Sequence, residues 1–516
     1  MSNAPAVFRS LLVYGLCLPL AVFLGYLLAN PLDPTTLMAV GVVLLALLIP
    51  LLLRWHHVWL IATWNMSAVV FFLPGRPNFW VVLAIISFTI GVLQYAMNRD
   101  LKFIYVPSVA RPLLFLAIVV LITAYVTGGI GMRAFGSATY GGKNYILLFT
   151  AIIGFFALTS RRIPPHRAVL YVQLFFLGTC TLAIGELARI LPSEFNFLYL
   201  TFPVLTMSAL VQQSTSVVAS TELVTRITGL SGPAIGVYYA MLAHYGIRGI
   251  FLDLKLWRVA VFCLTVVIGA LSGFRSITIL FAMTFAVLFF LERLHHTRLL
   301  PIFAIAGLLS VALLIPFANQ LPFAVQRSLA FLPLNLDTDA KISAITSTEW
   351  RLQMWRDIWP EVPQYLWQGK GYSFSGRELD IALDTARSSS GLESTEMAGD
   401  YHNGPLSVII PFGIAGALGF CWFLWAGLRV VYQNYLYGDP VYRCINTFVF
   451  AYFLVKIIFF FVAFGGLVVD LAAFAGLTGL SISLNGGVAK PALVPQPQAV
   501  ARQMKLQPGA RRPVSV

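Results

Sequence analysis

The chain of 516 residues is 59% hydrophobic and only 10% charged, and its mean hydropathy is +0.83. A soluble domain carries about 25% charged residues, so the composition excludes a water-soluble globular protein and indicates that lipid is part of the solvent. The net charge of +14 does not indicate nucleic-acid binding, because the cytoplasmic loops of membrane proteins collect Lys and Arg. Alternating strands of about ten residues, the signature of outer-membrane barrels, are absent from the sequence, and we expect an all-α bundle.

Apolar runs of spanning length recur along the chain. A spanning helix needs about 20 mostly apolar residues, and the first run, 11–28, is too long for the core of a signal peptide. We therefore expect a polytopic membrane protein with about 12–14 transmembrane helices. Segment 199–220 is apolar but rich in Ser, Thr and Gln, and we expect it to be interfacial or re-entrant. The candidate spans are 8–29, 36–53, 58–74, 78–97, 112–128, 145–159, 168–190, 232–247, 258–273, 276–291, 299–318, 405–428, 444–463 and 466–484.

The short loops alternate in their content of basic residues. One set holds most of the Lys and Arg between the spans, among them Arg54, Arg161 and Arg248, and the alternate set holds few. The positive-inside rule makes the first set cytoplasmic, and an even number of spans then puts both termini in the cytoplasm. The tail, 485–516, is rich in Pro, Gln and Arg without an apolar pattern, so we expect it to be disordered.

One loop differs from all the others. Residues 319–404 contain eleven of the chain's 20 acidic residues, which predicts a large water-facing loop on the side opposite the termini. Within it, Glu349–Val362 has apolar residues at helical spacing, with Thr348 as a plausible N-cap. The predicted organisation is thus transmembrane helices with short loops over 1–318, the large loop over 319–404, C-terminal transmembrane helices over 405–484, and the tail.

Four residues on the side of the large loop are candidates for chemistry: Arg226, Arg275, Arg351 and His402. Any one of these Arg residues could simply snorkel to lipid headgroups, and a lone His at a membrane edge more often caps a helix than catalyses. Their convergence on one side favours a site, because guanidinium groups suit phosphate and His is tuned to proton transfer near neutral pH. We predict an anionic phosphate substrate and a general base.

Metal chemistry is not expected. The five Cys residues form no CxxC pair and there is no zinc signature. The only Asp-x-Asp motif on the outer side near the membrane, Asp337-Thr-Asp339, lies in the solvated loop and is interpreted as an ordinary turn. Lys456 lies within a predicted span, which makes it a functional hypothesis by default; it could face a lipid diphosphate, pair with Asp470, or snorkel.

Four motifs, in order along 220–430, resemble those of the O-antigen ligase and O-antigen polymerase family. The large loop supplies Glu349-Trp-Arg-Leu-Gln-Met-Trp, followed by Gly369-Lys-Gly371, and its end supplies His402-Asn-Gly-Pro-Leu. The other two motifs are Leu271-Ser-Gly-Phe-Arg275, which is similar to the family's Ser-Arg turn between spans, and Arg226-Ile-Thr-Gly229 before a span.

The resemblance implies a membrane glycosyltransferase of the bacterial inner membrane that works without a metal or other cofactor. The donor would be a glycan on undecaprenyl diphosphate, and the acceptor a hydroxyl of a glycan or lipid on the periplasmic face, where the large loop would lie. His402 would be the base, and Arg226, Arg275 and Arg351 would hold the diphosphate. Whether the protein is a ligase or a polymerase stays open.

A transporter or flippase of polysaccharide or lipid-linked sugar is the alternative interpretation. Such proteins have many spans and interior charges, but they are typically built from inverted repeats with broken helices in matching halves. The sequence shows no such symmetry, and a large loop that ends in a His at the membrane edge is unusual for them. We therefore favour the enzyme.

Overall fold

The computed structural model describes scattered residues between 14 and 25, and then residues 34–98, 103–128, 130–131, 139–203, 227–253, 255–378, 380, 399 and 401–491. These residues form helices joined by turns, and the only β-pairing among them is two isolated bridges, Val69 with Asn78 and Tyr140 with Phe374. The predicted all-α fold is confirmed. The chain divides into two compact units, residues 1–59 and 60–516.

Eight helical segments in the described part of the chain are long and apolar enough to cross a membrane, which confirms the polytopic membrane fold. Two shorter apolar helices, α11 (Leu256–Leu271) and α12 (Arg275–Leu291), follow α10 (Ser231–Phe251). The eight are α3 (Phe79–Met97), α4 (Pro107–Val126), α5 (Gly142–Thr159), the α6–α7 segment (Pro165–Ala188), α13 with its last turn (Leu299–Gln320), α19 (Gly404–Tyr437), the α20 segment (Pro440–Val462) and α21 (Leu467–Asn485).

The predicted span 58–74 is wrong. A single helix, α2 (Pro34–Thr63), covers the first residues of that range and has a kink at Trp55. After Thr63 the backbone turns, and Val70 N donates a hydrogen bond to Pro77 O at 2.8 Å. Apolar content alone suggested the span, but the Pro-Gly-Arg-Pro run at 74–77 supplies turn residues that do not continue a helix.

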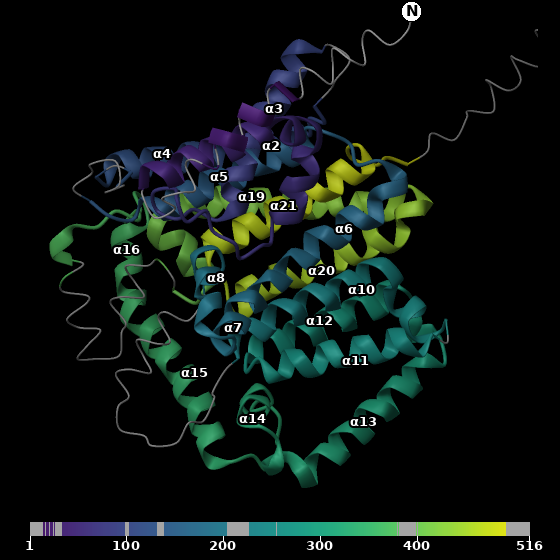
Figure 1. Ribbon diagram of the computed structural model, residues 1–516. Coiled ribbons are helices and arrows are strands. Elements are labelled where there is room, and N and C mark those ends of the chain that lie inside the picture. The colour runs from purple at the N-terminus through teal and green to yellow at the C-terminus, as the bar shows by residue number, and fades with distance from the viewer. Residues whose placement is uncertain are drawn as a thin grey trace, which may run out of the picture. The chain divides into compact units, whose positions relative to one another are not determined.

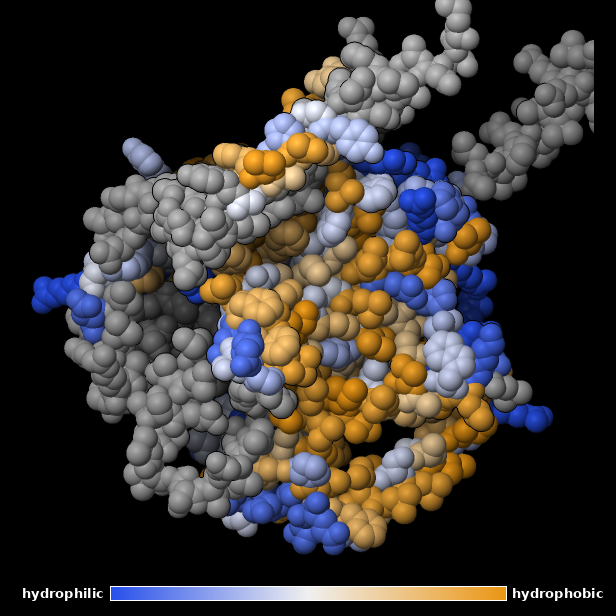
Figure 2. Space-filling model, viewed as in Figure 1, coloured by the Kyte–Doolittle hydropathy of each residue, from blue (hydrophilic) through white to orange (hydrophobic). Residues whose placement is uncertain are grey.

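The helices of the second unit differ greatly in burial. In α21, 78% of the most apolar 18-residue stretch is buried inside the protein, and this helix packs against α5, α19 and α20. In α13 (Leu299–Phe317) no residue is buried, although Phe303 contacts the rings of Phe251 and Phe285. Figure 2 shows a mostly orange surface over α11 to α13. Such a surface is compatible with lipid as the solvent.

Three further helices lie between α13 and α19: α14 (Phe323–Ser328), α15 (Thr338–Ile358) and α16 (Val362–Tyr365). In Figure 1, α15 passes across the ends of α12 and α20 instead of running alongside them. We call the end of the second unit at which α15 lies the α15 end. The helices α14 and α15 pack against each other, and α14 also packs on α11 and α12.

The helix predicted within the large loop begins eleven residues earlier than expected. Its N-cap is Asp337, whose side chain accepts a hydrogen bond from Asp339 N at 3.0 Å, so these two residues are more than an ordinary turn. The prediction that Thr348 is the N-cap is wrong, because Thr348 lies inside α15. Buried Ala340 and Ala344 extend the helix through packing, despite the unfavourable Ser and Thr residues around them.

Helix α19 is broken near Pro411, and the break connects it to the segment after α16. Gly413 there has φ +61°, a left-handed conformation that glycine adopts without steric cost. Backbone groups released by the break, two carbonyls and one N–H, form hydrogen bonds with another segment, which satisfies them inside the protein. The three backbone bonds are Ile414 N to Leu366 O (2.7 Å), Lys370 N to Ile410 O (2.8 Å) and Gly371 N to Pro411 O (3.0 Å).

Candidate active site at the start of helix α19

His402 immediately precedes the N-cap of α19. The cap is Asn403, whose side chain accepts a hydrogen bond from Leu406 N at 3.1 Å, and Pro405 follows inside the first turn. Both residue types are favoured at these positions of a helix. His402 itself has φ +47°, which is uncommon for a residue other than glycine and costs about 1–3 kcal/mol. The fold therefore specifies the direction of this side chain against a local preference.

Two aromatic rings flank the imidazole of His402. The Trp350 ring of α15 lies edge-on, with 5.5 Å between ring centroids, and the Phe464 ring lies at 5.1 Å. Phe464 belongs to the turn 463–466, which joins α20 to α21. Segments from three separate parts of the sequence thus meet at the half-buried imidazole.

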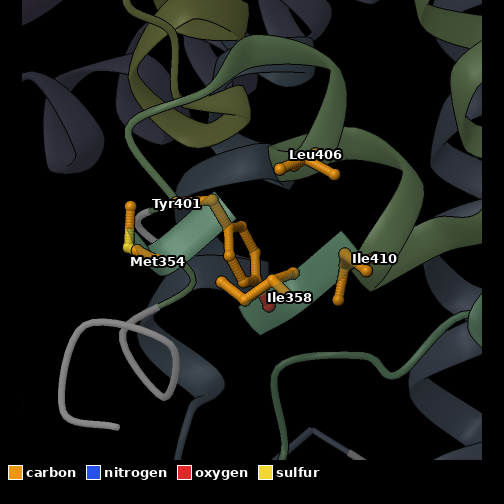
Figure 3. Close-up of a cluster of buried hydrophobic side chains, with 5 residues drawn as sticks. All are labelled: Met354, Ile358, Tyr401, Leu406 and Ile410. Atoms are coloured by element: carbon orange, nitrogen blue, oxygen red, sulfur yellow. The ribbon is translucent and has the colours of Figure 1, made fainter. Parts of the chain in front are cut away.

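A hydrophobic cluster beside His402 holds α15 against the start of α19. Figure 3 shows side chains from both helices, with the Tyr401 ring among them. Trp355 Nε1 also donates a hydrogen bond to Tyr401 O at 3.0 Å. Full burial of an apolar side chain contributes about 1.5–3 kcal/mol, so this cluster is sufficient to fix the two elements relative to each other. Its buried members are Met354, Ile358, Tyr401, Leu406 and Ile410.

Arg351 shares an aromatic neighbour with His402. Its guanidinium carbon lies 5.9 Å from the centroid of the Phe464 ring, which is within the range of a cation–π interaction. Phe464 therefore contacts the candidate base and a candidate phosphate ligand at the same time. The side chain of Arg351 is half-buried.

Arg275 contacts helix α15 about one turn away from Arg351. It is the first residue of α12, after Gly273 at φ +77°, and both of its terminal nitrogens donate to Thr348 Oγ1 at 3.2 Å. Thr348 precedes Arg351 by three residues, and residues at this spacing are neighbours on one helix face. Arg275 and Arg351 are consequently brought to the same face of α15.

The structure brings together three of the four residues predicted from sequence. Contacts join Arg275 through Thr348 to α15, and join Arg351 through Phe464 to His402. The fourth residue, Arg226, lies outside the described residues. Shortly after it, Thr228 donates a 2.6 Å hydrogen bond to buried Glu186.

Sequence reasoning missed Phe464 and did not decide the partner of Lys456. Phe464 is one of 40 Phe residues, and no motif marks it, because its role depends on a contact between residues 62 positions apart. For Lys456, the structure selects one of the three alternatives: its Nζ lies 2.6 Å from Asp470 Oδ1. Among the described residues, no group of three or more His, Cys, Asp or Glu could hold a metal ion.

The arrangement combines two kinds of chemistry. Two guanidinium groups, one from α12 and one from α15, suit a dianion such as a diphosphate, because each offers a planar fork of donors. An imidazole beside them can accept a proton near neutral pH.

A comparison with protein families matches the part of the chain that contains these residues. Residues 259–421 match the family model described as O-Antigen ligase, a range that runs from α11 into α19 and contains Arg275, Arg351 and His402. No curated protein matches the chain. Residues 259–421 of this polytopic α-helical membrane protein are therefore similar to the O-antigen ligase family, and this similarity supports a role like that of a membrane glycosyltransferase.

Proposed function

We propose that the protein transfers a glycan from undecaprenyl diphosphate to an acceptor hydroxyl on the periplasmic face of the bacterial inner membrane. The observation that carries the proposal is the series of contacts from Arg275 through α15 and Phe464 to His402. In this proposal the segment 319–404 is the periplasmic loop, and both termini are cytoplasmic. The partners are the lipid-linked donor, a glycan or lipid acceptor, and the surrounding lipids.

His402 acts as the general base. Its Nδ1 is buried, so Nε2 takes the proton of the acceptor hydroxyl as the oxygen attacks the anomeric carbon. A positioned base of this kind contributes about 10²–10⁴-fold to the rate. The bond from the acceptor oxygen to the anomeric carbon forms, and the bond from that carbon to the diphosphate oxygen breaks.

Arg275 and Arg351 stabilise the departing diphosphate. Negative charge increases on the leaving oxygen as the glycosidic bond breaks, and fixed cations directed at that charge lower the barrier. Arg275 is also the first residue of α12, where the helix dipole adds a favourable field for an anion. Arg226 is proposed as a third ligand on sequence grounds alone.

The test is a strain that lacks the gene, complemented with the wild-type protein or with His402→Ala at equal membrane abundance. The proposal predicts that glycan accumulates on the lipid carrier and that only the wild type restores transfer. Long chains on the carrier identify a ligase, and single repeat units identify a polymerase.

Two results would contradict the proposal. One is normal surface glycan in the strain that lacks the gene. The other is accumulation of lipid-linked glycan solely on the cytoplasmic side, which would instead indicate a flippase.

A further inference from the structure

A buried ion pair joins the two helices on either side of the turn 463–466. Lys456 of α20 and Asp470 of α21 are 2.6 Å apart, and their side chains are only 15% and 5% exposed. Charges inside a membrane protein are costly, and replacing a buried pair by apolar residues often leaves stability unchanged or improved. A contribution to stability is therefore a weak explanation for this pair.

The second carboxylate oxygen of Asp470 binds the backbone of the turn before α21. Asp470 Oδ2 accepts a 2.9 Å hydrogen bond from Gly466 N, and Asp470 N donates to Gly466 O, also at 2.9 Å. Gly466 is the N-cap of α21, and it has no side chain with which to cap the helix. The carboxylate of Asp470 instead accepts from the N–H of this N-cap residue, as an acidic side chain of the first turn does in a capping box, and Lys456 neutralises that carboxylate.

The turn fixed in this way, 463–466, carries Phe464. On its other side the turn is tied to the start of α19, because Ser407 Oγ accepts from Leu467 N at 3.0 Å and donates to Gly404 O at 2.6 Å. The backbones also approach closely: a Cβ atom on Gly465 would lie 2.8 Å from Gly404 Cα. The turn therefore has little freedom to move away from His402.

From these contacts we propose that Lys456 and Asp470 are positioning residues for the transfer reaction. Through the bond from Asp470 to Gly466, the pair holds the turn 463–466 so that the Phe464 ring packs against His402 and Arg351. This inference rests on the proposed function. A displacement of about 1 Å at a catalytic group can cost as much as 10²-fold in rate. Loss of the hydrogen bond that fixes this turn should therefore lower the transfer rate measurably.

The test compares two double variants that differ in one acceptor atom. Lys456→Met/Asp470→Asn removes both charges but keeps an oxygen for Gly466 N, whereas Lys456→Met/Asp470→Leu removes the charges and the acceptor at similar side-chain volume. Because both variants are neutral, neither leaves a buried charge without its partner. Three quantities are measured in proteoliposomes: kcat, KM for the lipid-linked donor, and hydrogen exchange of the amides in 463–467.

We expect the Asn variant to retain wild-type kcat within about threefold, and the Leu variant to lose about tenfold in kcat with little change in KM. Amide exchange in 463–467 should rise only in the Leu variant. Phe464→Leu should reproduce the loss in kcat, and adding it to the Leu double variant should cause no comparable further loss, because both changes act on one element.

Wild-type kcat in a folded Leu variant, or unchanged exchange in 463–467, would overturn the positioning role. Equal loss of kcat in the Asn and Leu variants would also overturn it, because the effect would then follow the charges and not the bond to Gly466. His402→Ala is assayed in parallel. If that variant transfers glycan normally, the proposed function fails; if it is inactive while the Leu variant is normal, only the positioning role fails.

Discussion

Helices α19, α20 and α21 are joined by buried polar groups at both of their ends, and the two junctions differ in kind. Away from the α15 end, the junction is neutral: the side chains of Asn446 and Asn485 exchange two 3.0 Å hydrogen bonds, and Asn434 donates to Ser481 Oγ. At the α15 end, the junction contains the ion pair of Lys456 and Asp470.

The two junctions differ in what their polar groups hold in place, and this distinguishes a structural junction from a functional one. The amide cluster satisfies its hydrogen bonds internally, and Asn434 and Asn446 are almost fully buried. The charged junction instead fixes a turn whose Phe464 ring contacts the half-buried His402. Changes in the amide cluster should therefore reduce stability, whereas changes around His402 should reduce transfer.

Apart from the loss of the base itself, the largest effect should come from Arg351→Lys, which keeps the charge but removes the planar fork of donors. We expect kcat/KM for transfer to fall about 100-fold, because Lys cannot bind a diphosphate with two parallel hydrogen bonds. Arg356→Lys is the matched control, since Arg356 is exposed on the same helix. Full activity of the Arg351 variant would mean that a point charge is sufficient.

A change at the neutral junction should have the opposite profile. Asn446→Leu removes both hydrogen bonds with Asn485, which keeps only its bond to Ser481 O, and this loss costs about 1–3 kcal/mol. We expect a lower thermal midpoint and an unchanged transfer rate per folded molecule, measured by thermal denaturation in detergent and by the transfer assay. Asn319→Leu, at an exposed position, controls for the substitution itself. Loss of transfer without loss of stability would invalidate the distinction between the two junctions.

A smaller effect is expected at the contact between α12 and α15. Thr348→Val removes the oxygen to which both terminal nitrogens of Arg275 donate, at the loss of about 0.5–1.5 kcal/mol. The KM for the lipid-linked donor should rise about 3- to 10-fold with little change in the thermal midpoint. An unchanged KM would show that Thr348 does not orient Arg275 in the working enzyme.

The smallest effect should appear in the segment after Gly371. Hydrogen bonds from the backbone and side chain of Ser375 lower the pKa of Glu378, with a weaker contribution from Lys370. Because the pKa of Glu378 is lower in the folded segment than in the unfolded chain, the ionised carboxylate stabilises the folded segment at pH values above the ordinary pKa. This contribution is lost as the pH falls through the lowered pKa. Glu378→Gln should remove the acid-dependent loss of amide protection at Ser375; a wild-type pH profile in the variant would exclude this assignment.

Much of the fold follows from local features of the sequence. Apolar runs of about 20 residues identify most helices because lipid imposes that length. The exceptions have physical causes. The 64–78 segment is apolar but contains turn residues, and α15 extends back to Thr338 through tertiary packing of Ala340 and Ala344, which local helix propensity does not reveal.

Some residues of the candidate site could likewise be predicted from the sequence, and others could not. Arg275, Arg351 and His402 could be predicted because they lie in short motifs with recognisable chemistry. Phe464 could not, since its contacts with His402 and Arg351 join segments remote in sequence. The pairing of Lys456 with Asp470 was one alternative among three, and only the packing of α20 on α21 decides between them.

Single-turnover transfer in proteoliposomes tests most directly whether His402 is the base for glycan transfer. His402→Ala should lower the transfer rate by about 10²–10⁴-fold, while the thermal midpoint and the binding of the lipid-linked donor stay close to wild type. Asn446→Leu, assayed at equal amounts of folded protein, should transfer at the wild-type rate. A folded His402→Ala protein that transfers glycan at the wild-type rate would contradict the account.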